Sequence, residues 1–367
     1  MHKLHEIQEK PKRAFLVSIL NGDINDEAMC RELEGLCITL DLAIITHEKI
    51  RVREKTAKFG MGSGKTESIS EKAAELKADL MVFNWNPTPS QQRNWEALSG
   101  IPVLDRQELI IRIFADRAST KEAELQVSLA RLTYFLPRLT HKYIDLSRQR
   151  GGRYGTKGAG ETKFETDRRK IEKRITLLEK EIEQVSKQRQ MQRRQRERTG
   201  IPVCAIVGYT NAGKSSLLNA LTGADVHIQD KLFVTLDAVT RRFQPAPGVN
   251  VLLTDTVGFI RELPHSLIKA FRSTLEEATL ANLLINILDA TAPDIESNYE
   301  TTISVLRELG AQDIPMITLL NKIDQLPDQK AALEELLNLF PGSIAVSAKL
   351  GTGLDDLKVR IVSMLGV

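Results

Sequence analysis

The sequence predicts an α/β protein in three parts: a small N-terminal α/β domain over residues 1–104, a long antiparallel helical hairpin over 105–199, and a C-terminal doubly wound α/β domain over 200–367. Short apolar runs alternate with amphipathic stretches in the first and last parts, which is typical of parallel sheets covered by helices. Between them, apolar residues recur at spacings of three and four, which indicates long paired helices. A chain of 367 residues is long enough to bury two or three cores.

In the N-terminal part we expect strands at 14–19, 78–83 and 101–104 and helices at 27–36 and 90–98. This alternation favours parallel strand pairing. Residues 60–66 are similar to a phosphate-binding loop, but the required first glycine falls at Phe59, and no strand pattern precedes it. We interpret this segment as a flexible or RNA-facing loop, with a second nucleotide site as the alternative.

The middle part contains two apolar seams that predict two helices packed as a hairpin. The first seam consists of Leu125, Leu129, Leu132, Leu136 and Leu139, and the second of Phe164, Ile171, Ile175, Leu178, Ile182 and Val185. The segment between them, residues 149–160, holds five glycines and no acidic residue. Glycines permit close backbone approach and cations contact phosphates, so this tip suits shape-based RNA binding.

Charge supports the same hypothesis. Residues 141–200 contain 18 Lys and Arg against 9 Asp and Glu, although the whole chain carries only +3. A basic segment in an otherwise acidic protein indicates contact with a polyanion, and nucleic acid is the first candidate. The alternatives are a solvated helix face and a flexible surface linker. The candidate RNA-binding residues are Arg148, Arg150, Arg153 and Lys157.

In the C-terminal part we expect strands at 201–207, 250–254, 283–288, 315–320 and 343–346, with helices at 214–221, 266–279, 295–309, 329–340 and 354–364. In a sheet of this kind a ligand binds at the carboxyl ends of the strands.

A phosphate-binding motif follows the first of these strands and opens a helix. The pattern G-x-x-x-x-G-K-[ST] is met by Gly208, Tyr209, Thr210, Asn211, Ala212, Gly213, Lys214 and Ser215, with Ser216 directly after it. Backbone N–H groups of such a loop face the phosphates at the positive end of a helix. Lys214 is expected to reach the β- and γ-phosphates, and the Ser215 hydroxyl to ligate Mg²⁺. A chance match in a turn is the alternative, which the strand–turn–helix context disfavours.

Three shorter motifs follow, each at the end of a predicted strand. They are Asp255, Thr256, Val257 and Gly258; Asn321, Lys322 and Asp324; and Ser347, Ala348 and Lys349. Asp255 is expected to hold the metal through a water and the Gly258 N–H to bond the γ-phosphate. A carboxylate at Asp324 accepts both N1–H and the N2 amine of guanine, whereas adenine leaves that carboxylate unpaired. These motifs predict a guanine nucleotide site.

The ordered motifs resemble those of the translation-factor-related GTPases, which have a Ras-like G domain, and more closely those of the HflX family in the Obg–HflX group. Residues 233–242 are similar to that family's first switch. By this resemblance Phe233, Val234, Thr235, Leu236 and Asp237 line the nucleotide, and Thr235 ligates Mg²⁺ and senses the γ-phosphate. The residues alone do not favour Thr235 over Thr240. The resemblance makes Ser215, Thr235 and Asp255 the metal set and Lys214, Thr235 and Gly258 the catalytic set.

The resemblance extends upstream through residues 91–96, 103–106, 114–118, 134–139, 151–162 and 165–169. It implies a GTPase that docks on the large ribosomal subunit and its RNA and splits or rescues idle or stalled ribosomes. Family members commonly carry a further small domain, whereas this sequence ends at Val367, so we expect a short form. A nucleotide-gated RNA-binding switch with little splitting activity is one alternative, and an ATP-dependent RNA remodeller that uses residues 60–66 is another.

The sequence supports further expectations about membrane spans, the cysteines, the rate of hydrolysis and a potassium ion. No apolar run approaches the ~20 residues that span a bilayer. Cys30, Cys37 and Cys204 have no metal-ligand spacing, so we expect three core thiols in a reducing cytoplasm. We also expect a monomer, since nothing in the sequence demands a dimer. Phe259 stands where related enzymes place a water-orienting Gln, which predicts slow intrinsic hydrolysis. Asn211 matches a phosphate-loop residue that holds K⁺ in related GTPases, and a neutral turn residue is the alternative.

Overall fold

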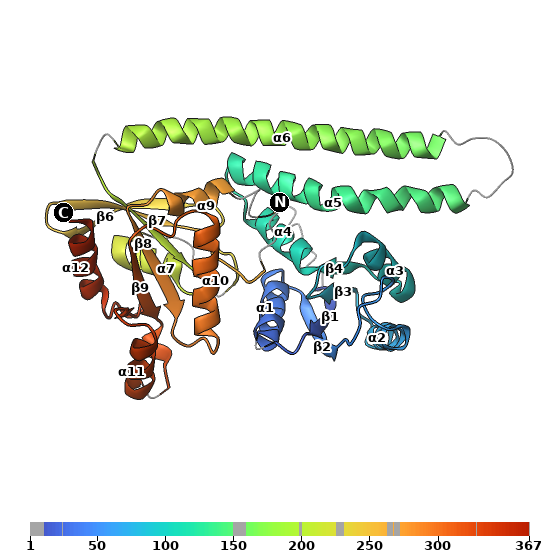
Figure 1. The fold of residues 1–367 in the computed structure, drawn as a ribbon, viewed down its shortest axis with the longest axis horizontal. Helices are drawn as coiled ribbons and strands as arrows, with labels where there is room; N and C mark the ends of the chain where they lie inside the picture. The colour runs from blue at the N-terminus through green and yellow to red at the C-terminus, as the bar shows by residue number, and fades with distance from the viewer. Residues whose placement is uncertain are drawn as a thin grey trace, which may run out of the picture. The chain divides into compact units, whose positions relative to one another are not determined.

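The computed structural model describes residues 11–23, 25–149, 159–197, 200–224, 231–262, 267, 272–327 and 329–366. The chain divides into two units, Met1–Ile113 with Pro137–Phe164, and Phe114–Leu136 with Glu165–Val367. Figure 1 labels most of the elements of both units. The two long helices that the sequence assigns to a separate middle domain are therefore shared between the units.

The first unit contains a four-stranded parallel sheet. Its strands are β1 (Arg13–Leu20), β2 (Ala43–Arg51), β3 (Leu80–Phe83) and β4 (Val103–Asp105), in the order β2-β1-β3-β4. Its helices are α1 (Asp26–Thr39), α2 (Ser63–Glu75), α3 (Pro89–Ser99) and α4 (Arg106–Arg117). The predicted parallel pairing is confirmed. The sequence prediction lacked β2 and α2, because β2 is a half-buried edge strand without clear alternation of apolar and polar residues.

Aromatic side chains form the centre of this unit's core. The Trp95 ring lies edge-on to the rings of Phe59 and Phe83, with centroids 5.7 and 5.1 Å apart, and Phe83 stacks on Trp85 at 4.1 Å. The Trp95 Nε1–H donates to the Phe59 carbonyl at 2.9 Å. Phe59 and Met61 are both buried in this core. Residues 63–66 form the first turn of α2, and Thr66 is buried, so the interpretation of residues 60–66 as a flexible loop is wrong.

Two long helices follow, α5 (Lys121–Gln149) and α6 (Ala159–Glu197), as Figure 1 shows. Both predicted helices exist, whereas their antiparallel packing stays a prediction. Leu125 and Tyr134 on α5 and Leu178 on α6 are buried. Pro137 lies inside α5, which continues past it. Among the residues that the structure describes, no helix is both long and apolar enough to cross a membrane.

The second unit contains a six-stranded sheet in the order β10-β9-β8-β5-β7-β6. The strands are β5 (Val203–Gly208), β6 (Val239–Ala246), β7 (Val249–Asp255), β8 (Leu283–Asp289), β9 (Met316–Asn321) and β10 (Ile344–Ala345). All neighbouring pairs are parallel except β6 with β7. The sequence prediction lacked β6, an edge strand with two exposed arginines that reads as a loop.

Helices cover both faces of this sheet. They are α7 (Lys214–Thr222), α9 (Arg272–Thr279), α10 (Ile295–Glu308), α11 (Gln329–Leu339) and α12 (Leu354–Leu365). Leu217 of α7 and Leu357 of α12 share a core with Ile206 of β5, whereas Ile295 of α10 packs with Leu288 of β8 in a second core. Successive strand residues point to opposite faces, so β8 contributes Ile287 to the first core and Leu288 to the second. The helix expected from residue 266 is observed from Arg272, and residues 263–266 and 268–271 lie outside the described chain.

Candidate functional site

The phosphate-binding loop connects the buried strand β5 to α7. Gly208 has φ = +142°, and a Cβ atom there would lie 2.4 Å from the Ile287 carbonyl oxygen, so the first position of the motif accepts only glycine. At the other end Lys214 opens α7. Its Nζ donates to the carbonyls of Gly208 at 3.2 Å and Tyr209 at 2.7 Å. The lysine thus folds back along the loop on which a phosphate would sit.

The Lys214 ammonium group is buried, and its charge state responds to its surroundings. Burial lowers the pKa of Lys214 to about 8, while the Asp255 carboxylate opposes this change and Lys322 adds to it. A buried cation is costly unless an anion pairs with it. A bound phosphate would supply that anion.

The three predicted metal ligands converge from three separate segments. The Ser215 hydroxyl donates to Asp255 Oδ2 at 2.7 Å, the Thr235 hydroxyl donates to the same oxygen at 2.9 Å, and the two hydroxyls lie 2.8 Å apart. The alternative residue Thr240 instead shares a hydrogen bond with the Thr254 hydroxyl on the neighbouring strand. The structure therefore brings Thr235, and not Thr240, to the metal set.

The surroundings of Asp255 fit a divalent cation. Within the described residues, its Oδ1 atom is buried without a hydrogen-bond partner. Burial raises the pKa of the Asp255 carboxyl, although Lys214 and the hydroxyl donors lower it. Hydroxyl and carboxylate oxygens are the ligands that Mg²⁺ prefers. Ser215, Thr235 and Asp255 would hold the ion directly or through water, and bound Mg²⁺ would neutralise charge on the β- and γ-phosphates.

Gly258 lies against the phosphate-binding loop after β7. A Cβ atom there would lie 2.8 Å from both Lys214 Nζ and Thr210 Cγ2, so a side chain would displace the lysine. The following residue, Phe259, accepts from the Thr210 N–H at 2.8 Å and donates to the Gly208 carbonyl at 3.1 Å. Its side chain is only 1% exposed. Phe259 is thus a core residue that anchors this segment and has no polar group to orient water.

The predicted base-binding residues gather at the ends of β9 and β10. The Asn321 Nδ2 donates to the Ala212 carbonyl at 2.9 Å, and the Asn321 Oδ1 accepts from the Ala348 N–H at 3.0 Å. The Ser347 hydroxyl donates to Asp324 Oδ1 at 2.6 Å. One amide therefore joins the phosphate-binding loop to the loop that would cover the base, and a carboxylate stands beside it.

Sequence reasoning missed Asp289 at the end of β8. Its Oδ2 accepts from Lys322 Nζ at 2.6 Å, while its Oδ1 accepts from the Thr291 N–H and hydroxyl. This pairing orients Lys322, whose backbone has φ = +66°. A carboxylate at the end of a buried parallel strand was the signal that could have identified it.

A pocket in front of the phosphate-binding loop contains most of the predicted phosphate-side residues. Lys231, which the sequence analysis also missed, contributes to it. The pocket is lined by Thr210, Asn211, Gly213, Lys214, Ser215, Ser216, Lys231, Phe233, Val234, Thr235 and Gly258.

Three predicted nucleotide-binding side chains point elsewhere. Leu236 and Val257 are buried apolar residues, and the Thr256 hydroxyl donates to the Ile206 carbonyl inside the sheet. The Asp237 carboxylate also points elsewhere: it accepts hydrogen bonds from Ser119 and Thr120, directly before α5. The sequence pattern did not reveal this contact because its partners lie more than a hundred residues upstream.

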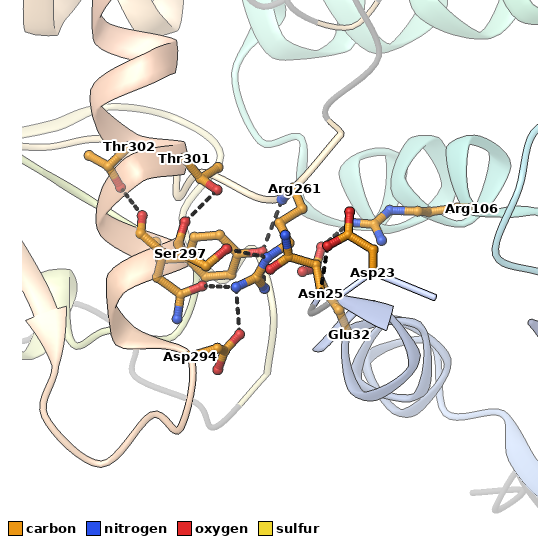
Figure 2. A network of polar contacts seen from close by, with 11 residues as sticks. Asp23, Asn25, Glu32, Arg106, Arg261, Asp294, Ser297, Thr301 and Thr302 are labelled. Carbon is orange, nitrogen blue, oxygen red and sulfur yellow. Dashed lines mark hydrogen bonds and ion pairs between the residues drawn. The ribbon is translucent and has the colours of Figure 1, made fainter. Parts of the chain in front are cut away.

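A buried arginine links the phosphate-binding loop to α10, as Figure 2 shows. Arg261 Nη2 donates to Asp294 at 2.5 Å and to Asn298 at 2.8 Å, and Nε donates to Ser297 at 3.3 Å. The Tyr209 hydroxyl accepts from the Arg261 backbone N–H at 2.9 Å and from Nη1 at 3.2 Å. The segment after Gly258 is thus tied at Phe259 and at Arg261. In the first unit, Figure 2 also includes the buried ion pair of Arg106 with Glu32.

Other predictions concern residues outside this site. Arg150, Arg153 and Lys157 lie outside the described residues, as does the side chain of Arg148. Cys30, Cys37 and Cys204 are buried free thiols, as predicted, and burial raises the pKa of both Cys37 and Cys204 to about 12. Among the described residues, no group of three His, Cys, Asp or Glu side chains is arranged to hold a metal ion.

Fold and site together define a P-loop domain for a guanine nucleotide. Family models match along the chain: a GTP-binding GTPase N-terminal region over residues 27–115, a GTP-binding GTPase middle region over 117–196, and a 50S ribosome-binding GTPase over 203–322. GTPase HflX of Akkermansia muciniphila is 47% identical, covering 99% of this chain and 86% of that protein. GTPase HflX of Escherichia coli is 39% identical, covering 94% and 81%. The chain belongs to the HflX family and hydrolyses GTP.

A solved structure agrees with this assignment. The SsGBP and GDP complex aligns with a TM-score of 0.50 at 25% identity, covering 97% of this chain and 98% of that one. The alignment therefore extends well beyond the nucleotide-binding domain.

Proposed function

We propose that this GTPase binds the large ribosomal subunit when it holds GTP, and that it splits or rescues idle or stalled ribosomes in the cytoplasm. The convergence of Ser215, Thr235 and Asp255 carries the nucleotide part of this proposal, because Thr235 belongs to a loop that would respond to the γ-phosphate. The match of residues 203–322 to a model described as a 50S ribosome-binding GTPase supports the ribosomal part.

In this proposal α5 and α6 pair as an antiparallel hairpin whose glycine-rich connection contacts ribosomal RNA. Three of the four candidate cations there, Arg150, Arg153 and Lys157, fall within eight residues and accompany five glycines. Such a segment allows the backbone to approach phosphates closely without reading bases. Binding through it is electrostatic, so raising the salt concentration is expected to weaken it steeply.

Co-sedimentation with separated ribosomal subunits tests the proposal. The protein is expected in the large-subunit fraction with a non-hydrolysable GTP analogue and much less with GDP. Replacing Arg153 and Lys157 by alanine is expected to reduce binding at least tenfold. A matched control replaces Lys330 and Arg360, two exposed cations of the second unit, and is expected to leave binding unchanged. Equal binding with both nucleotides, or equal loss in both double variants, would refute the proposal.

Hydrolysis is expected to depend on the ribosome. Phe259 is buried and pairs with the phosphate-binding loop, so a water-orienting group must come from elsewhere. GTP turnover with and without large subunits measures this dependence.

A second candidate function is a nucleotide-gated RNA-binding switch with little splitting activity, and such a switch would retain ribosome release when hydrolysis is blocked.

Asn211 supports a smaller proposal about a monovalent cation. It lies in the pocket with φ = +61°, a left-handed conformation that asparagine tolerates better than most residues. We expect faster GTP turnover in K⁺ than in Na⁺ at equal ionic strength. Equal rates would identify Asn211 as a turn residue only.

A further inference from the structure

The loop that carries Thr235 is also bonded to the start of α5. Both oxygens of Asp237 accept hydrogen bonds from the two residues that precede this helix. Its Oδ2 accepts from the Ser119 hydroxyl at 2.8 Å and from the N–H groups of Ser119 and Thr120 at 3.3 and 3.2 Å. Its Oδ1 accepts from the Thr120 hydroxyl at 2.5 Å. One carboxylate thus receives four hydrogen bonds from a single turn.

Thr120 continues this chain of contacts into α5. Its Oγ1 accepts from the Ala123 N–H at 3.2 Å, and its carbonyl accepts from the Glu124 N–H at 3.0 Å. Thr120 therefore caps the helix with its side chain, and Asp237 holds that side chain in place. The carboxylate also stands at the positive end of a 29-residue helix, where a negative charge is stabilising.

A single residue, Leu236, separates Asp237, which holds this cap, from Thr235 of the metal set. Thr235 and Asp237 are at most about 7 Å apart along the chain, and the intervening Leu236 is buried. On the other side, the ring of Phe233 packs edge-on against Phe114, with centroids 4.8 Å apart. Phe233 has φ = +54°, which is strained for a bulky residue and is maintained only by surrounding packing. The segment is thus held both at Phe233 and at Asp237.

We infer that Asp237 is a positioning residue that places Thr235 in the metal site and couples the γ-phosphate to the first turn of α5. The Thr235 hydroxyl meets Asp255 and Ser215 in the same loop conformation that the Asp237 contacts hold. A ligand that engages Thr235 must therefore favour the capped start of α5. By linkage, the cap favours that ligand to the same extent. The inference requires guanine nucleotide binding but not ribosome binding.

Nucleotide affinities test this inference. GDP has no γ-phosphate, so a residue that acts through Thr235 changes the affinity for a non-hydrolysable GTP analogue far more than the affinity for GDP. With Mg²⁺ present, Asp237→Asn places amide hydrogens against the donors of Ser119 and Thr120. We expect the analogue-to-GDP affinity ratio to fall at least fivefold, within the usual range of coupling between sites. Asp313→Asn, a matched change at an exposed aspartate of the same unit, is expected to leave the ratio unchanged.

The helix side provides a second, independent variant. Thr120→Val removes the hydroxyl that Asp237 holds, at a position that does not line the pocket in front of the phosphate-binding loop, and is expected to lower the same ratio. The double variant is expected to lose little more than either single one, because both remove one interaction. Amide hydrogen exchange of residues 119–124 is expected to slow when the analogue replaces GDP in the wild-type protein, and this difference should vanish in Asp237→Asn.

Three results would overturn the inference. A loss of GDP and analogue affinity in equal proportion would make Asp237 merely structural. An unchanged analogue-to-GDP affinity ratio in Thr120→Val would show that the cap of α5 is not coupled to the nucleotide. This test remains available if Asp237→Asn fails to fold. Identical exchange at residues 119–124 with GDP and with the analogue would show that the γ-phosphate does not reach α5.

Discussion

Replacing Asn321 by alanine is expected to destabilise the nucleotide-binding unit strongly. Asn321 is 2% exposed and joins the Ala212 carbonyl to the Ala348 N–H. The substitution leaves both backbone groups buried and unpaired, and each unpaired group lowers the free energy of unfolding by roughly 1–3 kcal/mol. We expect a total loss of about 3–4 kcal/mol. With a urea dependence of about 2 kcal/mol/M for a domain of this size, the unfolding midpoint should fall by roughly 1.5–2 M.

Urea unfolding followed by circular dichroism measures this change. The transition of the nucleotide-binding unit is recognised because added GDP moves it to higher urea. Asn282→Ala is the matched control. Asn282 is exposed, and its side-chain Oδ1 accepts from the Val203 N–H at 2.8 Å; its backbone N–H donates to the Val203 carbonyl, and the substitution keeps that bond. The loss of unfolding free energy in the control should therefore stay below about 1 kcal/mol. A midpoint shift for Asn321→Ala no larger than that of the control would refute the bridging role.

Substitutions at Asp324 and Phe259, and the pH dependence of Lys214, test other parts of the site. Asp324→Asn should weaken GTP binding and favour the xanthine nucleotide, as competition titrations would show, and retained preference for guanine would contradict the assigned base contact. Because phosphate binding favours the protonated form of Lys214, whose pKa is about 8, calorimetric affinity for GDP should fall as pH rises above 8, by up to about tenfold per pH unit. Between pH 8 and 10.5 the unfolding free energy of the nucleotide-free protein should rise with pH. In that range Lys214 has lost its proton in the folded state, where its pKa is about 8, but keeps it in the unfolded state, where its pKa is 10.5. Phe259→Gln should lower the free energy of unfolding by about 2–4 kcal/mol, measured by thermal or urea unfolding, because the side chain is buried. For the same reason it should not accelerate GTP turnover. Faster turnover would indicate that this side chain faces the reacting water.

The nucleotide site could be predicted because its chemistry depends on short contiguous motifs at strand ends. Gly208, Lys214 and Ser215 must follow one another for the loop to face phosphates, and that order is visible in the sequence. Thr235 could not be distinguished from Thr240 by residues alone, because the choice depends on which hydroxyl meets Asp255 in the fold.

What the sequence could not show are contacts between distant segments. Arg261 is one cation among many until the fold surrounds it with Asp294, Asn298 and the Tyr209 hydroxyl. Asp237 reads as part of a nucleotide-binding loop, yet its carboxylate caps a helix that starts 116 residues earlier in the chain. Edge strands β2 and β6 were missed for a related reason: strands with one solvated side and little apolar alternation resemble loops.

The aromatic core of the first unit has a practical consequence for spectroscopy. The protein has two tryptophans, and both Trp85 and Trp95 belong to that unit. Indole emission excited at the red edge of protein absorbance therefore reports only on the N-terminal sheet and its helices. The nucleotide-binding unit contributes no tryptophan emission. A fluorescent guanine nucleotide would report on the nucleotide-binding unit. The unfolding of each unit could then be followed at its own emission wavelength in one intact chain.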